Sequence, residues 1–341
     1  MSDGINVLSL FDGISCGMIA LERAGIKVNK YYASEIDKFA IQVSKDNYSD
    51  IIQLGDVTKW KEWNIDWASI DLLIGGSPCQ GFSLAGKKLN FEDSRSKLFF
   101  EYVNILNCIR DINPGIKFLL ENVKMKREWE EVISGFLGVS PIMINSALVS
   151  AQNRKRNYWA NWNFCQPNDK NIVLKDILEH EVNDGWRLHG GASRGRYDQE
   201  KKVKQQIEDN GTSKSNCLTT VEKDTLLLVR GNTPVEFREI HGAGQSIGKR
   251  MEKSYTLLAR DCKGLPRYEC AMTVVVLGNE QNDHVFIRQF TPVERERLQT
   301  LPDNYTAICS KTQRLKQTGN CWTADVIAHI FNHLKPLLCG N

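Results

Sequence analysis

A short apolar strand that is broken at once by glycines and a proline restricts the fold more than any other stretch. Leu72, Leu73 and Ile74 form the apolar run, and Gly75-Gly76-Ser77-Pro78 ends it. In an open α/β sheet, ligands bind beyond the carboxyl ends of such strands. The next residue, Cys79, is therefore either a buried apolar thiol, as most cysteines are, or a catalytic nucleophile.

The composition is that of an ordinary globular protein. The chain has 341 residues, 41% hydrophobic and 25% charged, which allows one large domain or two. A net charge of +3 is too small to identify a nucleic-acid partner. The ten cysteines show no CxxC pair and no zinc-site spacing, which indicates reduced intracellular thiols and no metal site. With no signal peptide or membrane-length apolar run, we expect a cytoplasmic protein.

The N-terminal stretch has the pattern that opens a nucleotide-binding βαβ unit. A strand is predicted over residues 7–11, a glycine turn over 12–17, and a helix from Met18 to about Gly25. Gly13 and Gly17 would let the backbone approach a ligand closely. The spacing is not GxGxxG, so a dinucleotide is not indicated.

Two acids follow the next two predicted strands. Glu35 ends the strand at 31–34, and an acid about 20 residues after a glycine turn often binds ribose hydroxyls, although a solvated loop glutamate is equally compatible. Asp56 follows the strand at 51–54 and could accept a hydrogen bond from an adenine amine. Together with Gly13, these strand ends fit an adenosine-containing ligand that needs no phosphate cradle, such as S-adenosylmethionine.

A second catalytic candidate lies further along the chain. The strand predicted at 116–120 delivers Glu121 at its end, where a carboxylate could act as an acid or could cap the next helix. Arg154 and Arg156 are two residues apart at the start of a predicted strand and so share one face. Basic runs are usually solvated, but the aromatic residues that follow indicate partial burial, where an arginine needs a partner.

The pattern of predicted secondary structure changes between about Phe164 and Phe286. Short strand-like runs at 225–229, 255–259 and 272–277 alternate with glycine-rich connections such as 190–196 and 242–250. Helical patterns resume after residue 288. We expect an α/β protein with an inserted, smaller β-rich part. Basic residues in its loops suit DNA phosphates and base edges, but an ordinary loop-rich subdomain would look similar.

Eight motifs, in order and over nearly the whole chain, resemble the DNA (cytosine-5) methyltransferase family. They are the cofactor loop Phe11 to Gly17, Glu35, Asp56, Pro78-Cys79-Gln80, Glu121-Asn122-Val123, Gln152 to Arg156, Arg288 to Gln299, and Gly319-Asn320. The family's closing motif usually continues with serine and valine, whereas Cys321-Trp322 follow here, as in the animal de novo enzymes.

The resemblance implies a Rossmann-like S-adenosylmethionine-dependent methyltransferase domain over 1–165 and 287–341, with a target-recognition domain at 166–286. It implies that Cys79 attacks C6 of a flipped-out cytosine, that Glu121 holds N3, that Arg154 and Arg156 bind the O2 side and orient Glu121, and that loop 81–96 covers the base. The implied cofactor contacts are Phe11, Asp12, Gly13, Ile14, Ser15, Gly17, Glu35, Ile36, Asp56, Val57, Pro78, Asn320 and Trp322, the last against the methionine end.

The implied substrate is a specific sequence of double-stranded DNA, methylated by a monomer of bacterial or phage origin that could pair with a restriction endonuclease. A tRNA cytosine methyltransferase is the alternative enzyme. A catalytically silent DNA-binding module is disfavoured by the intact set of Cys79, Glu121, Arg154 and Arg156. A cytosine deaminase is disfavoured because its zinc-site spacing is absent.

Overall fold

The computed structural model describes residues 4–77, 94–179, 187–197, 203–220, 225–231, 273–276 and 284–338. Pro78, Cys79 and most of the expected lid loop at 81–96 lie outside the described residues, as does the expected strand at 255–259. Within these ranges, none of the helices combines the length and apolarity that a membrane crossing requires.

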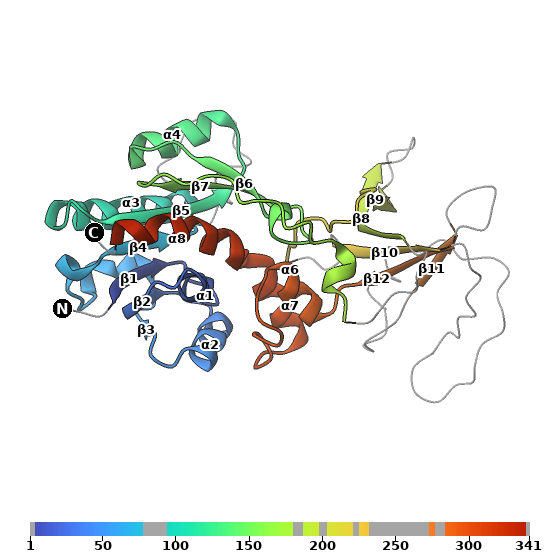
Figure 1. Cartoon of the computed structure of the whole chain (residues 1–341), viewed down its shortest axis with the longest axis horizontal. Helices are drawn as coiled ribbons and strands as arrows, with labels where there is room; N and C mark the ends of the chain where they lie inside the picture. Colours follow the sequence, from blue (N-terminus) through green and yellow to red (C-terminus); the bar gives the residue numbers. More distant parts are fainter. Residues whose placement is uncertain are drawn as a thin grey trace.

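A seven-stranded sheet forms the larger part of the molecule, in the order β3-β2-β1-β4-β5-β7-β6 (Figure 1). The pairs from β3 to β5 are parallel, and β7 runs antiparallel to both β5 and β6. This order confirms the predicted α/β class, because consecutive parallel strands need helical crossovers. The strands are β1 Ile5–Leu10, β2 Val28–Ser34, β3 Ile52–Gln53, β4 Leu72–Gly75, β5 Lys117–Val123, β6 Ile142–Asn145 and β7 Lys155–Ala160.

Helices cover both faces of this sheet, because its central strands are apolar on both sides. Leu72 and Ile74 of β4 face a core that includes α1 and α8, whereas Leu73 faces a core that includes α3 and α4. The helices are α1 Cys16–Arg23, α2 Lys38–Asn47, α3 Ser94–Ile112, α4 Arg127–Leu137, α6 Pro292–Leu298, α7 Lys311–Asn320 and α8 Ala324–Leu338. Short 3₁₀ helices are η1 Val57–Glu62, η2 Trp67–Ser69, η3 Ser146–Leu148 and η4 Leu174–Ile177.

A second, antiparallel sheet has the order β11-β12-β10-β8-β9 and lies at the other end of the molecule, beyond α6 and α7 (Figure 1). Its strands are β8 Arg187–Tyr197, β9 Val203–Asp209, β10 Leu226–Gly231, β11 Thr273–Val276 and β12 His284–Gln289. The predictions of strands at 225–229 and 272–277 are confirmed by β10 and β11.

The prediction of a connection at 190–196 is wrong, because these residues belong to β8. Glycine is present here for close packing and not for a turn. A Cβ on Gly190 would lie 2.5 Å from the carbonyl oxygen of Lys214, and one on Gly191 would lie 2.8 Å from the side chain of Leu228.

Candidate active site

The carboxyl ends of the parallel strands meet at one edge of the large sheet, and most of the predicted site residues lie there. Phe11 to Gly13 follow β1, Glu35 follows β2, Gly76 and Ser77 follow β4, and Glu121 lies near the end of β5. The side-chain amide of Asn122 donates to the carbonyl oxygen of Ser77 at 3.3 Å and to its hydroxyl at 3.2 Å. The strand that carries Glu121 is therefore tied to the last described residue before the Pro78-Cys79-Gln80 motif.

The loop after β1 adopts a backbone conformation that side chains rarely take. Phe11, Gly13 and Ser15 have φ angles of 57°, 60° and 61°, in the left-handed region. Glu35 holds this loop, because its Oε2 accepts from the backbone N–H of Gly13 at 2.8 Å while its Oε1 accepts from Ile36 and Asp37. A carboxylate has about four lone-pair sites, so Glu35 keeps acceptor capacity for a ligand hydroxyl.

The Asp12 carboxylate is enclosed by its partners, although the residue as a whole is only half-buried. It accepts from the Tyr31 hydroxyl at 2.7 Å and from the Ser15 hydroxyl at 2.5 Å. Burial raises its pKa to about 6, against the hydrogen bonds from Ser15 and Tyr31, which lower it.

The surface beside this loop has the features that an adenosine-bearing ligand requires. A Cβ on Gly13 or Gly55 would meet no atom within 4 Å, so the backbone there faces open space. The Ile36 side chain is 75% exposed, which leaves an apolar surface that a ligand ring can cover. Asp56 is half-buried and accepts from the backbone N–H of Thr58, an interaction that lowers its pKa and keeps it ionised.

Three of the residues predicted to contact the cofactor are core residues in the structure. Ile14 and Val57 are buried within hydrophobic clusters. Gly17 allows α1 to pack on the sheet, since a Cβ there would lie 2.6 Å from both the Ile74 side chain and the Tyr31 hydroxyl. Their direct contact with a ligand stays a prediction, as it does for Asn320, which is exposed at the end of α7.

Glu121 is held on both carboxylate oxygens. The Arg156 Nε lies 3.1 Å from Oε1, and the indole N–H of Trp322 donates to Oε2 at 3.2 Å. Gly76 makes room for this arrangement, because a Cβ there would lie 2.9 Å from the Trp322 nitrogen and 3.0 Å from Glu121 Oε2. Trp322 was expected against the methionine end of the cofactor, and that contact stays a prediction; in the structure its indole N–H binds the predicted catalytic acid.

Arg154 and Arg156 both contact the Cys217 sulfur, which agrees with the prediction that they share one face, but their other partners differ. The Arg154 guanidinium is buried and donates to the carbonyl oxygens of Leu218 at 3.2 Å, Gly319 at 3.4 Å and Cys321 at 3.0 Å. These bonds hold the backbone next to Trp322. Arg154 would therefore orient Glu121 only indirectly, through the hydrogen bond from Trp322.

Cys217 is a further residue of this site that no sequence motif predicted. Its sulfur accepts from Arg154 at 3.4 Å and from Arg156 at 3.7 Å. The segment around it packs tightly on the catalytic part, since a Cβ on Gly319 would lie 2.6 Å from the backbone of Thr219. A long-range contact of this kind leaves no local pattern in the sequence that could have identified it.

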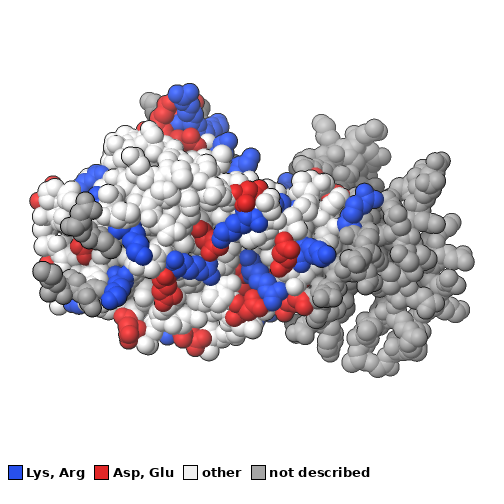
Figure 2. Space-filling view, in the orientation of Figure 1, with Lys and Arg blue, Asp and Glu red and all other residues white. Residues whose placement is uncertain are grey.

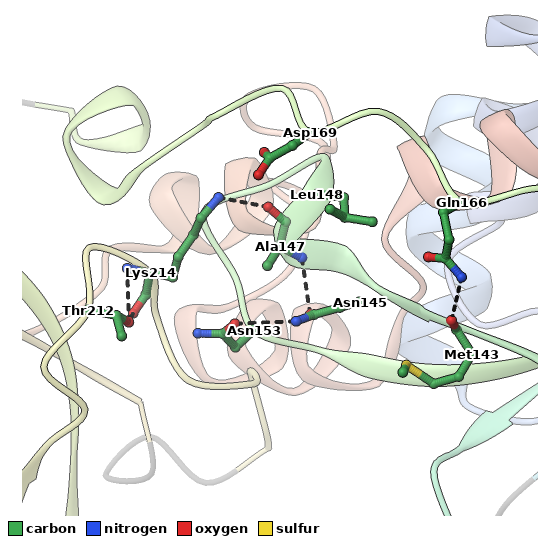
Figure 3. A pocket seen from close by; sticks show the side chains of 9 residues that line it. All are labelled: Met143, Asn145, Ala147, Leu148, Asn153, Gln166, Asp169, Thr212 and Lys214. Atoms are coloured by element: carbon green, nitrogen blue, oxygen red, sulfur yellow. Dashed lines mark hydrogen bonds between the residues drawn. The ribbon is translucent and has the colours of Figure 1, made fainter.

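A separate hollow of about 320 Å³ lies where residues 212–214 pack beside β6 and η3 (Figure 3). It contains none of the predicted site residues. The Lys214 ammonium donates to the carbonyl oxygens of Ala147 at 2.7 Å, Ser150 at 3.2 Å and Ile172 at 2.6 Å. Burial lowers the pKa of Lys214. These bonds join the two parts of the molecule.

On the face shown in Figure 2, the lysines and arginines of the described residues are interspersed with acids. This face of the described part therefore presents no continuous basic surface. The small net charge of +3 agrees with such mixing.

Comparison with known proteins gives one consistent result. A family model described as C-5 cytosine-specific DNA methylase matches residues 5–136 and 138–336. The chain is 30% identical over 354 residues to Type II methyltransferase M1.ScrFI of Lactococcus lactis subsp. cremoris, covering 97% of this chain and 78% of the relative. It is 28% identical over 449 residues to Orphan methyltransferase M.SPRI of Bacillus phage SPR, covering 97% of each. In fold, it resembles the Dnmt2 methyltransferase of S. pombe, with a TM-score of 0.58 at 16% identity, over 98% of this chain and 99% of that one.

We predict that Asp12→Asn changes how stability depends on pH. The folded-state pKa of about 6 is above the ordinary 3.8, so the stability that the protonated carboxyl contributes is complete below pH 3.8 and is lost as pH rises through 6. The substitution removes this loss, so the stability of the variant relative to wild type should improve by about 2 kcal/mol between pH 4 and pH 7. Urea unfolding at a series of pH values measures this difference. Asp56→Asn is the control, since the lowered pKa of Asp56 predicts the opposite sign; a flat Asp12 difference curve would contradict the assignment.

We also predict that Arg154 is needed for folding stability. Arg154→Met leaves buried carbonyl oxygens without a donor and should lower the free energy of unfolding by about 2–4 kcal/mol. Arg127→Met is the matched control, because Arg127 is exposed and its pair with Glu131 is worth only a few tenths of a kcal/mol. Equal losses in the two variants would contradict this role.

Proposed function

Since the chain belongs to the C-5 cytosine-specific DNA methylase family, we propose that it transfers the methyl group of S-adenosylmethionine to C5 of a cytosine in duplex DNA. The chain is a DNA (cytosine-5) methyltransferase by its family and by its named relatives. The proposal concerns the cofactor, the covalent route and the residues that act.

The observation that carries the proposal is the geometry around Glu121. A nearly buried carboxylate, 8% exposed, is fixed on one oxygen by Arg156 and on the other by Trp322. It lies on the strand that is hydrogen-bonded to Ser77, the residue from which the chain enters Pro78-Cys79-Gln80. A fixed acid, on a strand tied to the residue that precedes a cysteine-containing motif, supports the pairing of acid and thiol that nucleophilic addition to a cytosine ring requires.

In the proposed mechanism, the Cys79 thiolate adds to C6 of the target cytosine. Glu121 holds N3 and stabilises the negative charge that the addition sends into the ring, which makes C5 nucleophilic. Arg156 keeps Glu121 in place and offers its remaining N–H groups to the O2 side of the base. After C5 has gained a methyl group, a base removes the C5 proton, the C6–sulfur bond breaks, and the Cys79 thiolate is regenerated.

The residues at the ends of β1, β2 and β3 would hold the cofactor. Glu35 has acceptor capacity for the ribose hydroxyls, Ile36 offers its exposed side chain to the adenine ring, and Gly13 leaves room for close backbone approach. Asp12 places negative charge near the site of a cationic ligand. When bound, S-adenosylmethionine supplies the methyl group and leaves as S-adenosylhomocysteine.

The target base reaches this site only when it is flipped out of the duplex, at a cost of a few kcal/mol. We propose that residues 166–286, which contain most of the second sheet, read the sequence around it, and that residues 81–96 close over the base. The tRNA alternative is not favoured, because the matching family model is that of a cytosine-specific DNA methylase. We further propose that the protein acts as a monomer. A partner restriction endonuclease stays a proposal, since the relatives include both a type II and an orphan enzyme.

Duplex DNA that carries 5-fluorocytosine tests the covalent step. Attack and methyl transfer can proceed on this base, but fluorine cannot leave as a cation, so Cys79 cannot be eliminated. With S-adenosylmethionine present, we expect a protein–DNA complex that survives denaturing electrophoresis. It should disappear in Cys79→Ser, because a hydroxyl is a far weaker nucleophile at neutral pH.

Cys108→Ser serves as the matched control, since Cys108 is a free thiol of α3 away from the strand ends. The complex should form normally in that variant. A complex that persists in Cys79→Ser, or no complex with wild-type enzyme that methylates ordinary cytosine, would refute the covalent route.

Trp322→Phe separates two roles for the tryptophan. Phenylalanine keeps an aromatic ring but removes the N–H donor to Glu121. If Trp322 positions the acid, the single-turnover rate should fall about 10-fold while the dissociation constant for S-adenosylmethionine changes less than about 2-fold. If Trp322 instead serves mainly as a cofactor contact, the dissociation constant rises and the rate at saturation is unchanged, which would overturn the positioning role.

A further inference from the structure

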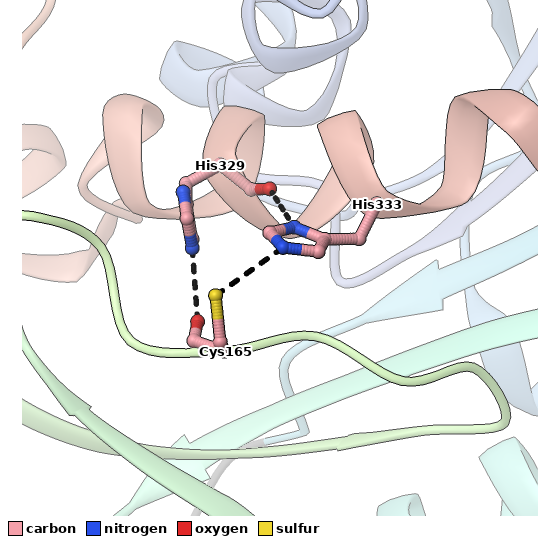
Figure 4. A group of neighbouring side chains, drawn as sticks. All are labelled: Cys165, His329 and His333. Atoms are coloured by element: carbon pink, nitrogen blue, oxygen red, sulfur yellow. Dashed lines mark hydrogen bonds between the residues drawn. The ribbon is translucent and has the colours of Figure 1, made fainter.

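Three metal-ligating side chains come together on the surface of the catalytic part, away from the strand ends (Figure 4). Cys165 lies in the segment after β7, while His329 and His333 are one turn apart on α8. The sulfur and the ring nitrogens lie within 4.8 Å of one another. The sequence spacing predicted no metal site, because Cys165 lies 164 residues from His329 and 168 from His333.

The hydrogen bonds of His333 select the tautomer that can bind a metal through Nε2. Its Nδ1 lies 3.0 Å from the backbone carbonyl of His329, and because a carbonyl only accepts, Nδ1 carries the hydrogen. The lone pair of neutral His333 is then on Nε2, which faces the Cys165 sulfur at 3.4 Å. An imidazole with its second nitrogen held by a carbonyl is the usual arrangement of a metal-binding histidine.

His329 lies beside this pair, with its ring centroid 4.8 Å from that of His333. The His329 ring is half-buried. Its Nε2 donates to the Cys165 carbonyl at 2.9 Å, and a metal would replace this bond with the ring hydrogen transferred to Nδ1. The nearby ammonium of Lys170 is paired with Asp325 at 2.7 Å, which reduces its repulsion of a cation.

From this geometry we propose that Cys165, His329 and His333 bind a divalent transition-metal ion of the zinc class. One thiolate and two imidazoles are ligands that Zn²⁺ prefers, and they leave a fourth tetrahedral position for water. Tetrahedral bonds of about 2.0–2.3 Å place ligand atoms roughly 3.3–3.8 Å apart, so a shift of about 1 Å closes the site. Binding converts the Cys165 thiol to a thiolate and releases its proton to solvent.

The ion would strengthen an existing junction. The indole N–H of Trp162 donates to the carbonyl oxygen of Ile330 on α8 at 3.2 Å. Trp162 lies three residues before Cys165, and Ile330 lies between the two histidines in sequence. A metal at Cys165 adds a second attachment of the same segment to the same helix, at the point where the chain leaves the large sheet. Its expected effect is on stability, because a ligand that binds only the folded state raises the unfolding temperature.

Titration of the chelator-treated, full-length protein with Co²⁺ tests the proposal, followed by metal analysis after equilibration with Zn²⁺ and gel filtration. We expect one ion per chain, a thiolate-to-cobalt charge-transfer band, and a higher unfolding temperature with Zn²⁺. Cys165→Ser should lose the band and the rise in unfolding temperature, and His329→Ala and His333→Ala should each weaken binding at least tenfold. Cys108→Ser should behave as wild type.

Circular dichroism of each metal-free variant separates loss of the site from loss of the fold, and the two histidine variants preserve the test if Cys165→Ser does not fold. A band that persists in folded Cys165→Ser would overturn the proposal, because it would place the ion on another thiol. Wild-type protein that binds no Co²⁺, or histidine variants with unchanged affinity, would also overturn it.

Discussion

The double attachment of the Glu121 carboxylate joins the parts of the chain on which the rest of the site depends. Arg156 brings β7 to β5, and Trp322 brings the segment between α7 and α8 to the same acid. The indole lies over Gly76, where no Cβ fits, so the end of β4 is part of the same contact. A buried charge with one partner removed is costly, which explains why both oxygens are satisfied.

The second sheet is connected to this centre by polar groups that have well-defined partners. Lys214 donates to the backbone carbonyls of Ala147 and Ser150 in the catalytic part, and Arg154 donates to carbonyls on both sides of the junction. Cys217 from the same segment contacts both arginines. A change in the position of residues 212–219 would therefore reach Trp322, and through it Glu121, along hydrogen bonds that the structure contains.

Local patterns were sufficient to predict much of this architecture. The strand ends carrying Gly13, Glu35 and Glu121 were found because apolar runs and the residues that break them are local signals. Residues 190–196 were misread, since glycines that permit close packing look like glycines that make turns. The bond between Trp322 and Glu121 spans 201 residues, and no single-sequence pattern encodes it. Cys79 itself lies outside the described residues.

The central claim is that this site methylates C5 of cytosine in DNA through Cys79. The most direct measurement is mass spectrometry of nucleosides from the DNA and RNA of a methylation-free host that expresses either the wild-type protein or Cys79→Ala. We expect 5-methylcytosine in DNA with the wild-type protein and none with the variant. Methylation at N4, 5-methylcytosine confined to RNA, or 5-methylcytosine that persists with Cys79→Ala would contradict it.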